Sequence, residues 1–494
     1  YYKFISKKVN VMGSNQREYF KVSNYGEGLQ VKVYARAKGN DTNFVMYNRI
    51  FNPSVTREIR LYGMNDDDLF EIEENAKSRI KIRIIGGKGN DTFDIRGQTE
   101  ALLYDLKTDG NFIKNSSHAK NRFSLDPPVN DKNVLGFNYN TTKVPLINLH
   151  YNSDDGLLVG AGIARRTYGF RNLPYASDQK FGILYAPNRK AFQLNYRGEF
   201  NHITRTTDLI LKGNFSNPAL RNFTGLTNNP QVDKNRNFNY YQTRFRSLEL
   251  EALVRKRFFE KLHLMIGPYF YHYNNKYSDN AGYVLGKYRE LQLDSADIFS
   301  KKNYAGGKLA LLVDNRNKEF FPTRGLYWYT EVTGATGISK GSDGYVKYTT
   351  DMAIYASFRD PANLVAILKF GGGRIFSKNF EYFQALSIGA NSNLNGFRKN
   401  RFSGNSTLYT GIELKIKLAD VNSFILPGSF GITGFYDLGR VWVKGEQSRK
   451  WHGAFGGGLY YMPFNIFAIN ATAGFSEGEK MLNFTLGTKI NLTY

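Results

Sequence analysis

Apolar and polar residues alternate strictly at the carboxyl end of this chain. In MLNFTLGTKINLTY, residues 481–494, apolar side chains occupy the even positions Leu482, Phe484, Leu486, Ile490, Leu492 and Tyr494. Successive side chains of a β-strand point to opposite faces, so the segment has one apolar and one polar face. A strand of a soluble sandwich alternates in the same way, so the number of repeats has to decide between the architectures.

The alternation recurs over most of the chain. Sixteen segments carry it, at 145–151, 156–166, 180–187, 190–200, 205–215, 238–256, 261–274, 303–314, 325–334, 345–359, 362–371, 406–418, 428–437, 451–461, 466–474 and 481–493. Bacterial outer-membrane barrels have an even number of antiparallel strands. The sequence therefore predicts an all-β fold, with a sixteen-stranded antiparallel transmembrane β-barrel over residues 145–494.

The connections between these segments differ in length in a regular way. Short turns occur at 258–261, 360–363 and 462–465, and longer polar segments at 216–237, 275–302 and 372–405. Transmembrane barrels have short periplasmic turns and longer extracellular loops. We expect the short turns to face the periplasm and the long segments to face outside.

Composition agrees with a barrel and excludes several other classes. Aromatic residues make up 15% of the 494 residues, as in the aromatic girdles of barrels, and the absence of Cys excludes disulfides and thiolate metal sites. A net charge of +24 suits a Lys- and Arg-lined lumen and the phosphates of lipopolysaccharide and other outer-membrane lipids. No nucleic-acid-binding module occurs, so we expect no nucleic-acid partner. The GISKG sequence at 337–341 lies in a polar loop rather than on a strand-to-helix turn, so we expect no enzyme activity.

Residues 1–125 alternate differently and carry acidic turns. The turns are KGNDTNF (38–44), GMNDDDLFEI (63–72) and GGKGNDTFDI (86–95), and KGNDT occurs twice. This repetition predicts a small β-rich unit of solenoid-like or sandwich-like form, joined to the barrel by a linker at 126–144.

The acidic turns allow two interpretations. GGKGNDTFD fits a calcium-binding nonapeptide, with oxygen ligands available from Asp66, Asp67, Asp68, Asn90 and Asp91. Gly-Asn-Asp is also ordinary turn chemistry, and the spacing here is longer than in calcium β-rolls. We favour the turn interpretation, keep calcium as the alternative and expect no other cofactor.

One extracellular loop differs from the others. NLNGFRKNRFSG, residues 393–404, combines cationic, aromatic and glycine residues between the eleventh and twelfth predicted strands. Three further stretches stand out: DNRNKEFFPTRG after the eighth strand, GIELKIKL with Glu413 in the twelfth, and FYDLGRVW with Asp437 and Gly439 in the thirteenth.

These stretches resemble the BamA/TamA superfamily, the outer membrane protein 85 family. The resemblance covers roughly residues 145–494 and implies a sixteen-stranded barrel that inserts or translocates proteins, with its sixth extracellular loop folded into the lumen. The residues that match the family's loop motif are Leu394, Gly396, Phe397, Arg401, Phe402 and Gly404. The residues that match its periplasmic turn are Asp314, Arg316, Pro322 and Gly325.

The chain departs from the family at one motif position. The arginine that pairs with acidic groups of the lumen wall in the family is replaced here by Asn395. Alternation places Glu413 and Asp437 on the lumen side, where an acid is expected to have a cationic partner. We therefore predict that Arg398 or Arg401 pairs with one of these acids.

Further stretches narrow the resemblance and leave the function open. YNSDDGLLVGAG (151–162) and NFTGLTN (222–228) are similar to Bacteroidota barrels of this superfamily, some of which carry an upstream metallophosphoesterase. We therefore predict an outer-membrane barrel that inserts or translocates proteins, with a periplasmic N-terminal unit and residues upstream of Tyr1. Its partners would be client outer-membrane proteins or periplasmic and lipoprotein subunits. The alternatives are an anchor for an upstream phosphoesterase and a structural subunit of a larger complex.

Overall fold

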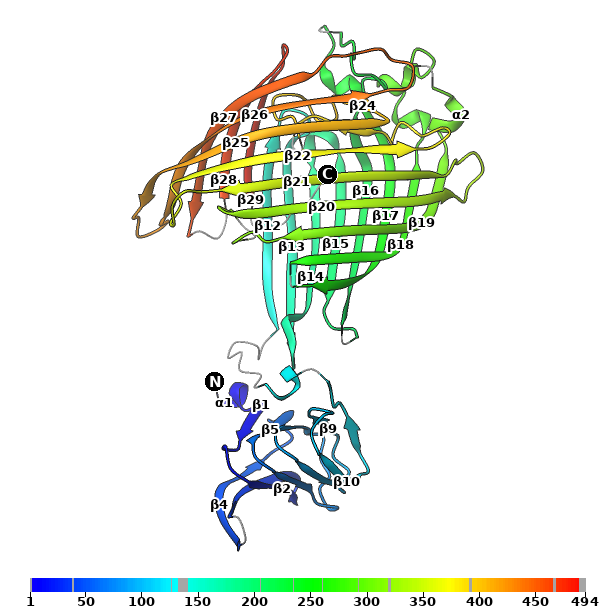
Figure 1. Ribbon diagram of the computed structural model, residues 1–494. Coiled ribbons are helices and arrows are strands. Elements are labelled where there is room, and N and C mark those ends of the chain that lie inside the picture. Colours follow the sequence, from blue (N-terminus) through cyan, green and yellow to red (C-terminus); the bar gives the residue numbers. More distant parts are fainter. Residues whose placement is uncertain are drawn as a thin grey trace. The chain divides into compact units, whose positions relative to one another are not determined.

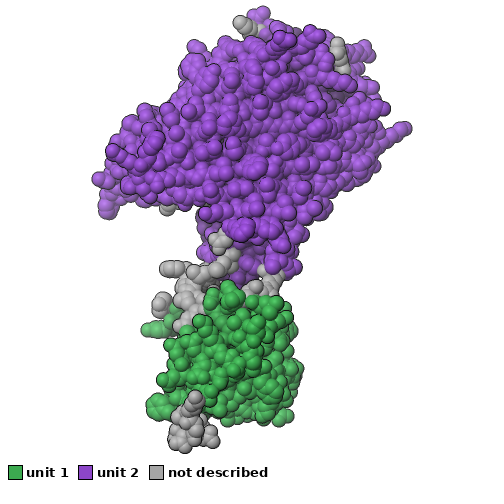
Figure 2. Space-filling view, viewed as in Figure 1, with its two compact units in different colours: residues 1–140 green, residues 141–494 purple. Residues whose placement is uncertain are grey.

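The chain divides into two compact units, residues 1–140 and 141–494 (Figure 2). The computed structural model describes residues 2–37, 40–125, 127–131, 141–204, 206–233, 235–259, 261–291, 293–318, 321–390, 393–464 and 468–487. None of the helices in these ranges has the length and apolar character that crossing a membrane requires.

The first unit stacks its strands as the rungs of a small solenoid. One sheet is parallel throughout and orders its strands as β1 (Lys8–Met12), β5 (Glu58–Asn65), β7 (Lys81–Lys88), β9 (Ala101–Tyr104) and β11 (Ala119–Asn121). The other sheet orders β10 (Phe112–Ser116), β8 (Thr92–Ile95), β6 (Leu69–Ile72), β2 (Glu18–Tyr25), β3 (Gly28–Ala37) and β4 (Asn40–Phe51). Short helices α1 (Tyr2–Ile5) and η1 (Pro127–Asn130) flank the sheets in sequence.

Alternating apolar residues of both sheets form the core of this unit. The rings of Phe20, Phe70 and Phe93 stack from rung to rung, with centroid distances of 4.7 and 5.5 Å. In the parallel sheet of β1, β5, β7, β9 and β11, Ile59 pairs with Ile82, and Ile82 pairs with Ala101. The predicted small β-rich unit is confirmed. Its parallel strand pairs make it solenoid-like, whereas β3 and β4 extend the second sheet in antiparallel fashion.

The second unit is a closed antiparallel barrel of sixteen strands among the residues that the structure describes. The strands are β12 (Thr142–Asn152), β13 (Gly156–Gly169), β14 (Asn172–Ala186), β15 (Ala191–Phe200), β16 (Thr207–Asn222), β17 (Gln242–Phe258), β18 (Leu262–Asn274), β19 (Lys301–Asp314), β20 (Gly325–Gly337), β21 (Tyr345–Ala356), β22 (Leu364–Phe376), β25 (Ser406–Val421), β26 (Gly428–Trp442), β27 (His452–Pro463), β28 (Ala468–Phe475) and β29 (Lys480–Gly487). The predicted fold class is confirmed, and each predicted strand overlaps one observed strand (Figure 1).

Because consecutive strands are antiparallel neighbours, the connections between them lie alternately at the two ends of the barrel. The long segments 223–241, 275–300 and 377–405 share one end, which we call the loop end. It carries the short helices η2 (Pro187–Arg189), η3 (Phe238–Tyr241), η4 (Tyr277–Asp279), η5 (Val284–Lys287) and α2 (Ser295–Ile298). The turns at 259–261 and 357–363 share the opposite end, where β12 begins at Thr142 rather than at residue 145.

Side chains alternate between the outer wall and the lumen. On β25, Ile412, Leu414 and Ile416 are 47, 43 and 38% exposed on the outer wall. The lumen side carries ion pairs instead: Lys308 pairs with Glu251 and Glu331, and Arg255 pairs with Glu199 and Asp208. Basic residues thus line the lumen together with acidic partners.

The barrel closes where its first and last strands pair, a junction that we call the seam. Five described pairs join β12 to β29, from Asn148 with Gly487 to Asn152 with Asn483. Residues 488–494 of the predicted last strand, including the terminal Tyr494, lie outside the described residues.

Candidate functional site: the lumen loop and the seam

The segment 377–405 leaves β22 at the loop end and folds back into the barrel before β25 begins. It contains a short hairpin of β23 (Leu386–Ile388) and β24 (Phe402–Gly404). Leu394, Phe397 and Phe402 are 0, 2 and 3% exposed and form a cluster with Val441 and Ala454 of the barrel wall. We call residues 393–404 the lumen loop.

Glycines let the lumen loop approach the wall closely. A Cβ atom on Gly396 would lie 2.5 Å from the Phe475 carbonyl oxygen and 2.8 Å from the Ala454 Cβ. On the wall, a Cβ on Gly474 would lie 2.5 Å from the Asn395 carbonyl oxygen. All three distances are shorter than van der Waals contact, so any side chain at either glycine would push the loop away from β28. Gly396 is therefore required for close approach.

An aromatic stack fixes the position of the loop in the lumen. The Phe402 ring stacks on His452 of β27 with a centroid distance of 3.8 Å, and Phe397 contacts Phe402 edge-on at 5.1 Å. His452 Nε2 lies 2.8 Å from the Asn228 carbonyl oxygen. Thr224 donates its hydroxyl to the Arg401 carbonyl at 2.9 Å. The loop 223–241 thus holds the lumen loop from its other side.

Asn395 binds one of the two acids that alternation places in the lumen. Its backbone N–H and its side-chain amide both donate to Asp437 Oδ2, at 2.9 and 2.7 Å. The other acid, Glu413, pairs with Lys369 at 2.7 Å and Lys415 at 3.4 Å, both on barrel strands. Asn395 therefore contacts the wall acid itself, through hydrogen bonds in place of an ion pair.

The predicted pairing of Arg398 or Arg401 with these acids is wrong. Arg398 Nη1 lies 2.8 Å from Asp154 Oδ1, and the Lys399 backbone N–H donates to Asp154 Oδ2 at 2.8 Å. Arg398 also stacks over Phe238, 4.3 Å from the ring centroid. Asp154 lies in the turn between β12 and β13 and is 3% exposed. The difference arises from the position of these residues along the barrel axis. Arg398 and Arg401 lie near the loop end, beside the turns that carry Asp154 and Glu479, whereas Asn395 lies beside Asp437 on β26.

Arg401 binds a second turn at the same end of the barrel. Its Nε lies 2.6 Å from Glu479 Oε1, and the Arg398 backbone N–H donates to Glu479 Oε2 at 2.9 Å. Glu479 lies between β28 and β29. Ser476 of the same turn donates to the Gly396 carbonyl at 2.7 Å. The lumen loop therefore holds the turns on both sides of the seam.

The turn between β19 and β20 contains the other predicted motif. Arg316 binds Asp314 through Nε and Nη2 at 2.8 and 2.7 Å and stacks over Tyr327. Gly325 has φ of +116°, a conformation that favours glycine. Pro322 lies in the same connection, at the end opposite the lumen loop. The described residues of this motif shape a turn and do not contact the lumen loop.

The acidic turns at 63–72 and 86–95 of the first unit stack into a buried column. The Glu18 N–H donates to Asp68, the Asp68 N–H to Asp91 and the Asp91 N–H to Asn111, at 2.7, 2.8 and 2.7 Å. Burial raises the pKa of Asp68 to about 9. It also raises the pKa values of Asp91 and of Asp105, which are close together in the column.

A second column lies beside the first, nearer the surface. Asp66 and Asp67 bind Arg17, the Asn90 N–H donates to Asp67 at 2.9 Å, and the Gly110 N–H donates to Asn90 at 2.8 Å. Asp67 and Asp68 of the turn at 63–72, and Asn90 and Asp91 of the turn at 86–95, therefore cap the backbone of a neighbouring rung. In the predicted turn at 38–44, the side chains of residues 38–43 lie outside the described residues. Calcium binding by these residues stays a prediction, since no group of three His, Cys, Asp or Glu in the described ranges is arranged around a metal position.

Sequence reasoning missed the residues that the lumen loop contacts. Asp154 lies in YNSDDGLLVGAG, and Thr224 and Asn228 lie in NFTGLTN. In the sequence, both stretches carry only a resemblance to other barrels. The acidic and amide residues of these stretches, next to turns, were the only sign of a functional role. Nothing in the sequence indicated that they contact residues 393–404.

This geometry defines a sixteen-stranded outer-membrane β-barrel with a loop between its eleventh and twelfth strands folded into the lumen. The Omp85 superfamily domain matches residues 185–478, and the chain belongs to that superfamily. Among curated protein sequences, no relative matches the chain.

Solved structures show similarity at low sequence identity. BamA from Haemophilus ducreyi lacking POTRA domains 1–3 matches with a TM-score of 0.50 and 15% identity, over 71% of this chain and 70% of that chain. CdiB from Acinetobacter baumannii matches with a TM-score of 0.44 and 12% identity, over 70% of this chain and 59% of that chain. At this identity the similarity to BamA shows the fold alone.

Proposed function

We propose that this barrel inserts other proteins into the outer membrane, or translocates them across it, by opening at the seam between β12 and β29. Proteins of the Omp85 superfamily are generally transporters or assembly factors rather than enzymes. The first unit would lie in the periplasm, on the side where β12 begins. Client barrel proteins and periplasmic or lipoprotein subunits would be its partners.

The observation that carries the proposal is the double attachment of the lumen loop. Arg398 and Lys399 bind Asp154 on one side of the seam, and Arg401 binds Glu479 on the other. One short segment thus fastens both hairpins that form the seam. Releasing that segment would free the loop end of the seam without disturbing the other strand pairs.

The membrane explains why such a seam needs a fastening. Unpaired backbone N–H and C=O groups are costly in hydrocarbon, so an open seam is unstable unless another strand pairs with it. A client strand can supply those hydrogen bonds by adding to the exposed edge. The fastening would keep the seam closed until a client strand competes for the edge.

The first test locks the seam. The chain has no native cysteine, so Leu149→Cys with Leu486→Cys places a single disulfide across paired residues of β12 and β29. We expect the wild-type protein in liposomes to accelerate folding of an unfolded outer-membrane barrel client. We expect the oxidised variant to lose that acceleration and to regain it after reduction.

A matched control uses the neighbouring hairpin. Leu149→Cys with Val159→Cys joins β12 to β13, which stay paired in an open seam, so oxidation should not change activity. If wild-type protein does not accelerate client folding above empty liposomes, or translocate a client, the proposal is wrong. If the locked seam stays fully active, the seam mechanism is wrong.

Orientation has its own test. In intact cells an impermeant thiol reagent should label Lys276→Cys, on the loop 275–300, and spare Asn363→Cys, on the opposite turn. The reverse labelling pattern would place the loop end in the periplasm and contradict the proposed topology.

A further inference from the structure

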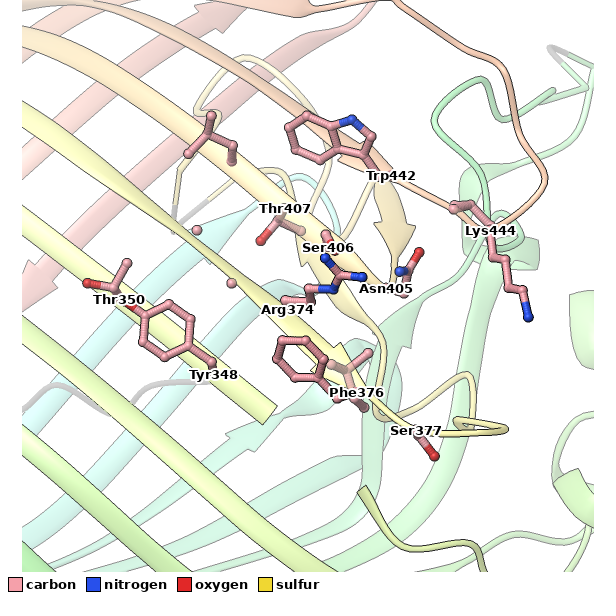
Figure 3. A pocket seen from close by; sticks show the side chains of 15 residues that line it. Tyr348, Thr350, Arg374, Phe376, Ser377, Asn405, Ser406, Thr407, Trp442 and Lys444 are labelled. Atoms are coloured by element: carbon pink, nitrogen blue, oxygen red, sulfur yellow. The ribbon is translucent and has the colours of Figure 1, made fainter. Parts of the chain in front are cut away.

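A groove of about 970 Å³ lies on the outer wall of the barrel, at the loop ends of β21, β22, β25 and β26 (Figure 3). Tyr348, Phe376, Leu408 and Trp442 line it and are 39, 52, 47 and 38% exposed. Ile375 and Thr407, their neighbours in sequence, are buried toward the lumen side. The groove therefore opens on the surface that faces lipid.

Two cations of this groove have no acidic partner in the part of the chain that the structure describes. No carboxylate among the described residues lies within 4.0 Å of the Arg374 guanidinium or the Lys444 amine, and no Asp or Glu lines the groove. Lumen cations such as Lys308 and Arg255 do have such partners. An unpaired cation at the membrane surface is stabilised by a lipid phosphate, as in basic pockets that bind anionic head groups.

The polar groups beside these cations suit a sugar. Thr350, Ser377, Asn405 and Ser406 line the same groove, and Figure 3 shows Ser406 and Asn405 close to Arg374. Hydroxyl and amide side chains both donate and accept hydrogen bonds, as sugar hydroxyls require of their partners.

Aromatic residues place this groove at the height of the lipid head groups. Arg440 stacks over Trp442 at 4.4 Å and over Trp451 at 5.7 Å. Trp and Tyr gather at membrane–water interfaces, where their polar atoms remain hydrated. Below this level the outer wall continues with apolar residues such as Phe370 and Leu368. A bound lipid would thus have its phosphate near the aromatic residues and its acyl chains along the apolar wall.

We propose that this groove is a binding site for lipid A, the phosphorylated glycolipid of the outer leaflet. Arg374 and Lys444 lie apart in the groove and bind separate phosphates of lipid A (Figure 3). Asn405 and Ser406 bind its sugar, and Tyr348, Leu408 and Trp442 contact an acyl chain. The site rests on the proposed orientation, in which the loop end faces outside, and does not depend on client insertion.

The test measures lipid retention on the full chain by native mass spectrometry in detergent, with added bis-phosphorylated lipid A. We expect wild-type protein to retain one molecule per chain. Arg374→Gln with Lys444→Gln should weaken retention at least ~10-fold, because charge-assisted hydrogen bonds to phosphate are lost. Dephosphorylated lipid A should bind wild-type protein as weakly as lipid A binds the double variant.

The control variant removes two positive charges, as the Arg374/Lys444 variant does, but at another place on the loop end. Lys276→Gln with Arg289→Gln changes two exposed cations of the loop 275–300 and should retain lipid A like wild type. Heat-modifiable migration on gels verifies that each variant forms a folded barrel. Equal retention by wild type and the Arg374/Lys444 variant would overturn the proposal. Equal competition by phosphatidylglycerol would overturn the assignment to a glycolipid. Client insertion in liposomes free of lipid A reports on the proposed function separately.

Discussion

Removing the charge of Asp154 should release the lumen loop from the first side of the seam. The Asp154 side chain is 2% exposed and accepts from the Arg398 guanidinium and the Lys399 N–H, both at 2.8 Å. Breaking a buried ion pair costs about 3–5 kcal/mol, and a hydrogen bond to a charged group contributes about 1.5–3 kcal/mol. Because the Arg398 side chain is 26% exposed, hydration offsets part of this, and we expect about 2 kcal/mol for Asp154→Asn.

Trypsin cleavage within the lumen loop measures this release. Cleavage after Lys399 and Arg401 requires the loop to leave the lumen, and its rate follows the population of the open form when reclosing is fast. A loss of about 2 kcal/mol raises that population ~30-fold. Arg398→Gln should have a similar effect, and the Asp154→Asn/Arg398→Gln double variant should add little to either single change, because both remove the same interaction.

A matched acid elsewhere in the barrel provides the control. Asp178 pairs with Arg166 at 2.9 Å and its side chain is 8% exposed, but neither residue contacts the lumen loop. Asp178→Asn should leave cleavage at Lys399 and Arg401 unchanged. Wild-type cleavage rates in Asp154→Asn, or fully additive effects in the double variant, would refute the reasoning.

Four further outcomes are expected. Gly396→Ala should increase loop cleavage as strongly as Asp154→Asn, because the added Cβ would clash with the Phe475 carbonyl; unchanged cleavage would contradict that contact. Asp437→Ala should also loosen the loop by removing the acceptor of Asn395, and thermal unfolding in detergent would show a lower midpoint. The contribution of Asp68 to the stability of the first unit should be greatest below its unfolded pKa, near 3.8, because its folded pKa is raised. That contribution should fall by up to about 1.4 kcal/mol per pH unit as pH rises toward 9. Hydrogen exchange of β6 and β8, corrected for intrinsic pH dependence, should show this loss, and Asp68→Asn should remove it. Calorimetry with and without EDTA should show no large shift if the acidic columns act as caps, whereas a large calcium-dependent shift would support the metal alternative.

The sequence by itself determined the strands and the faces of their residues. A strand has a side-chain period of two, so each alternating segment identified a strand and placed Ile412 outside and Glu413 inside. The lengths of the connections also distinguished the two ends of the barrel, because antiparallel strands bring every second connection to the same end. The acidic turns at 63–72 and 86–95 likewise indicated stacked rungs in the first unit.

Only the tertiary structure decided which residues meet in the lumen. Alternation gives the face of a residue but not its height along the barrel or the depth of a loop folded inside it. Arg398 could therefore not be assigned to Asp154, which is 244 positions away, and the sequence pointed instead to Glu413 and Asp437. The attachment of one loop to both sides of the seam arises because barrel closure brings the first and last hairpins together, and no local pattern records that closure.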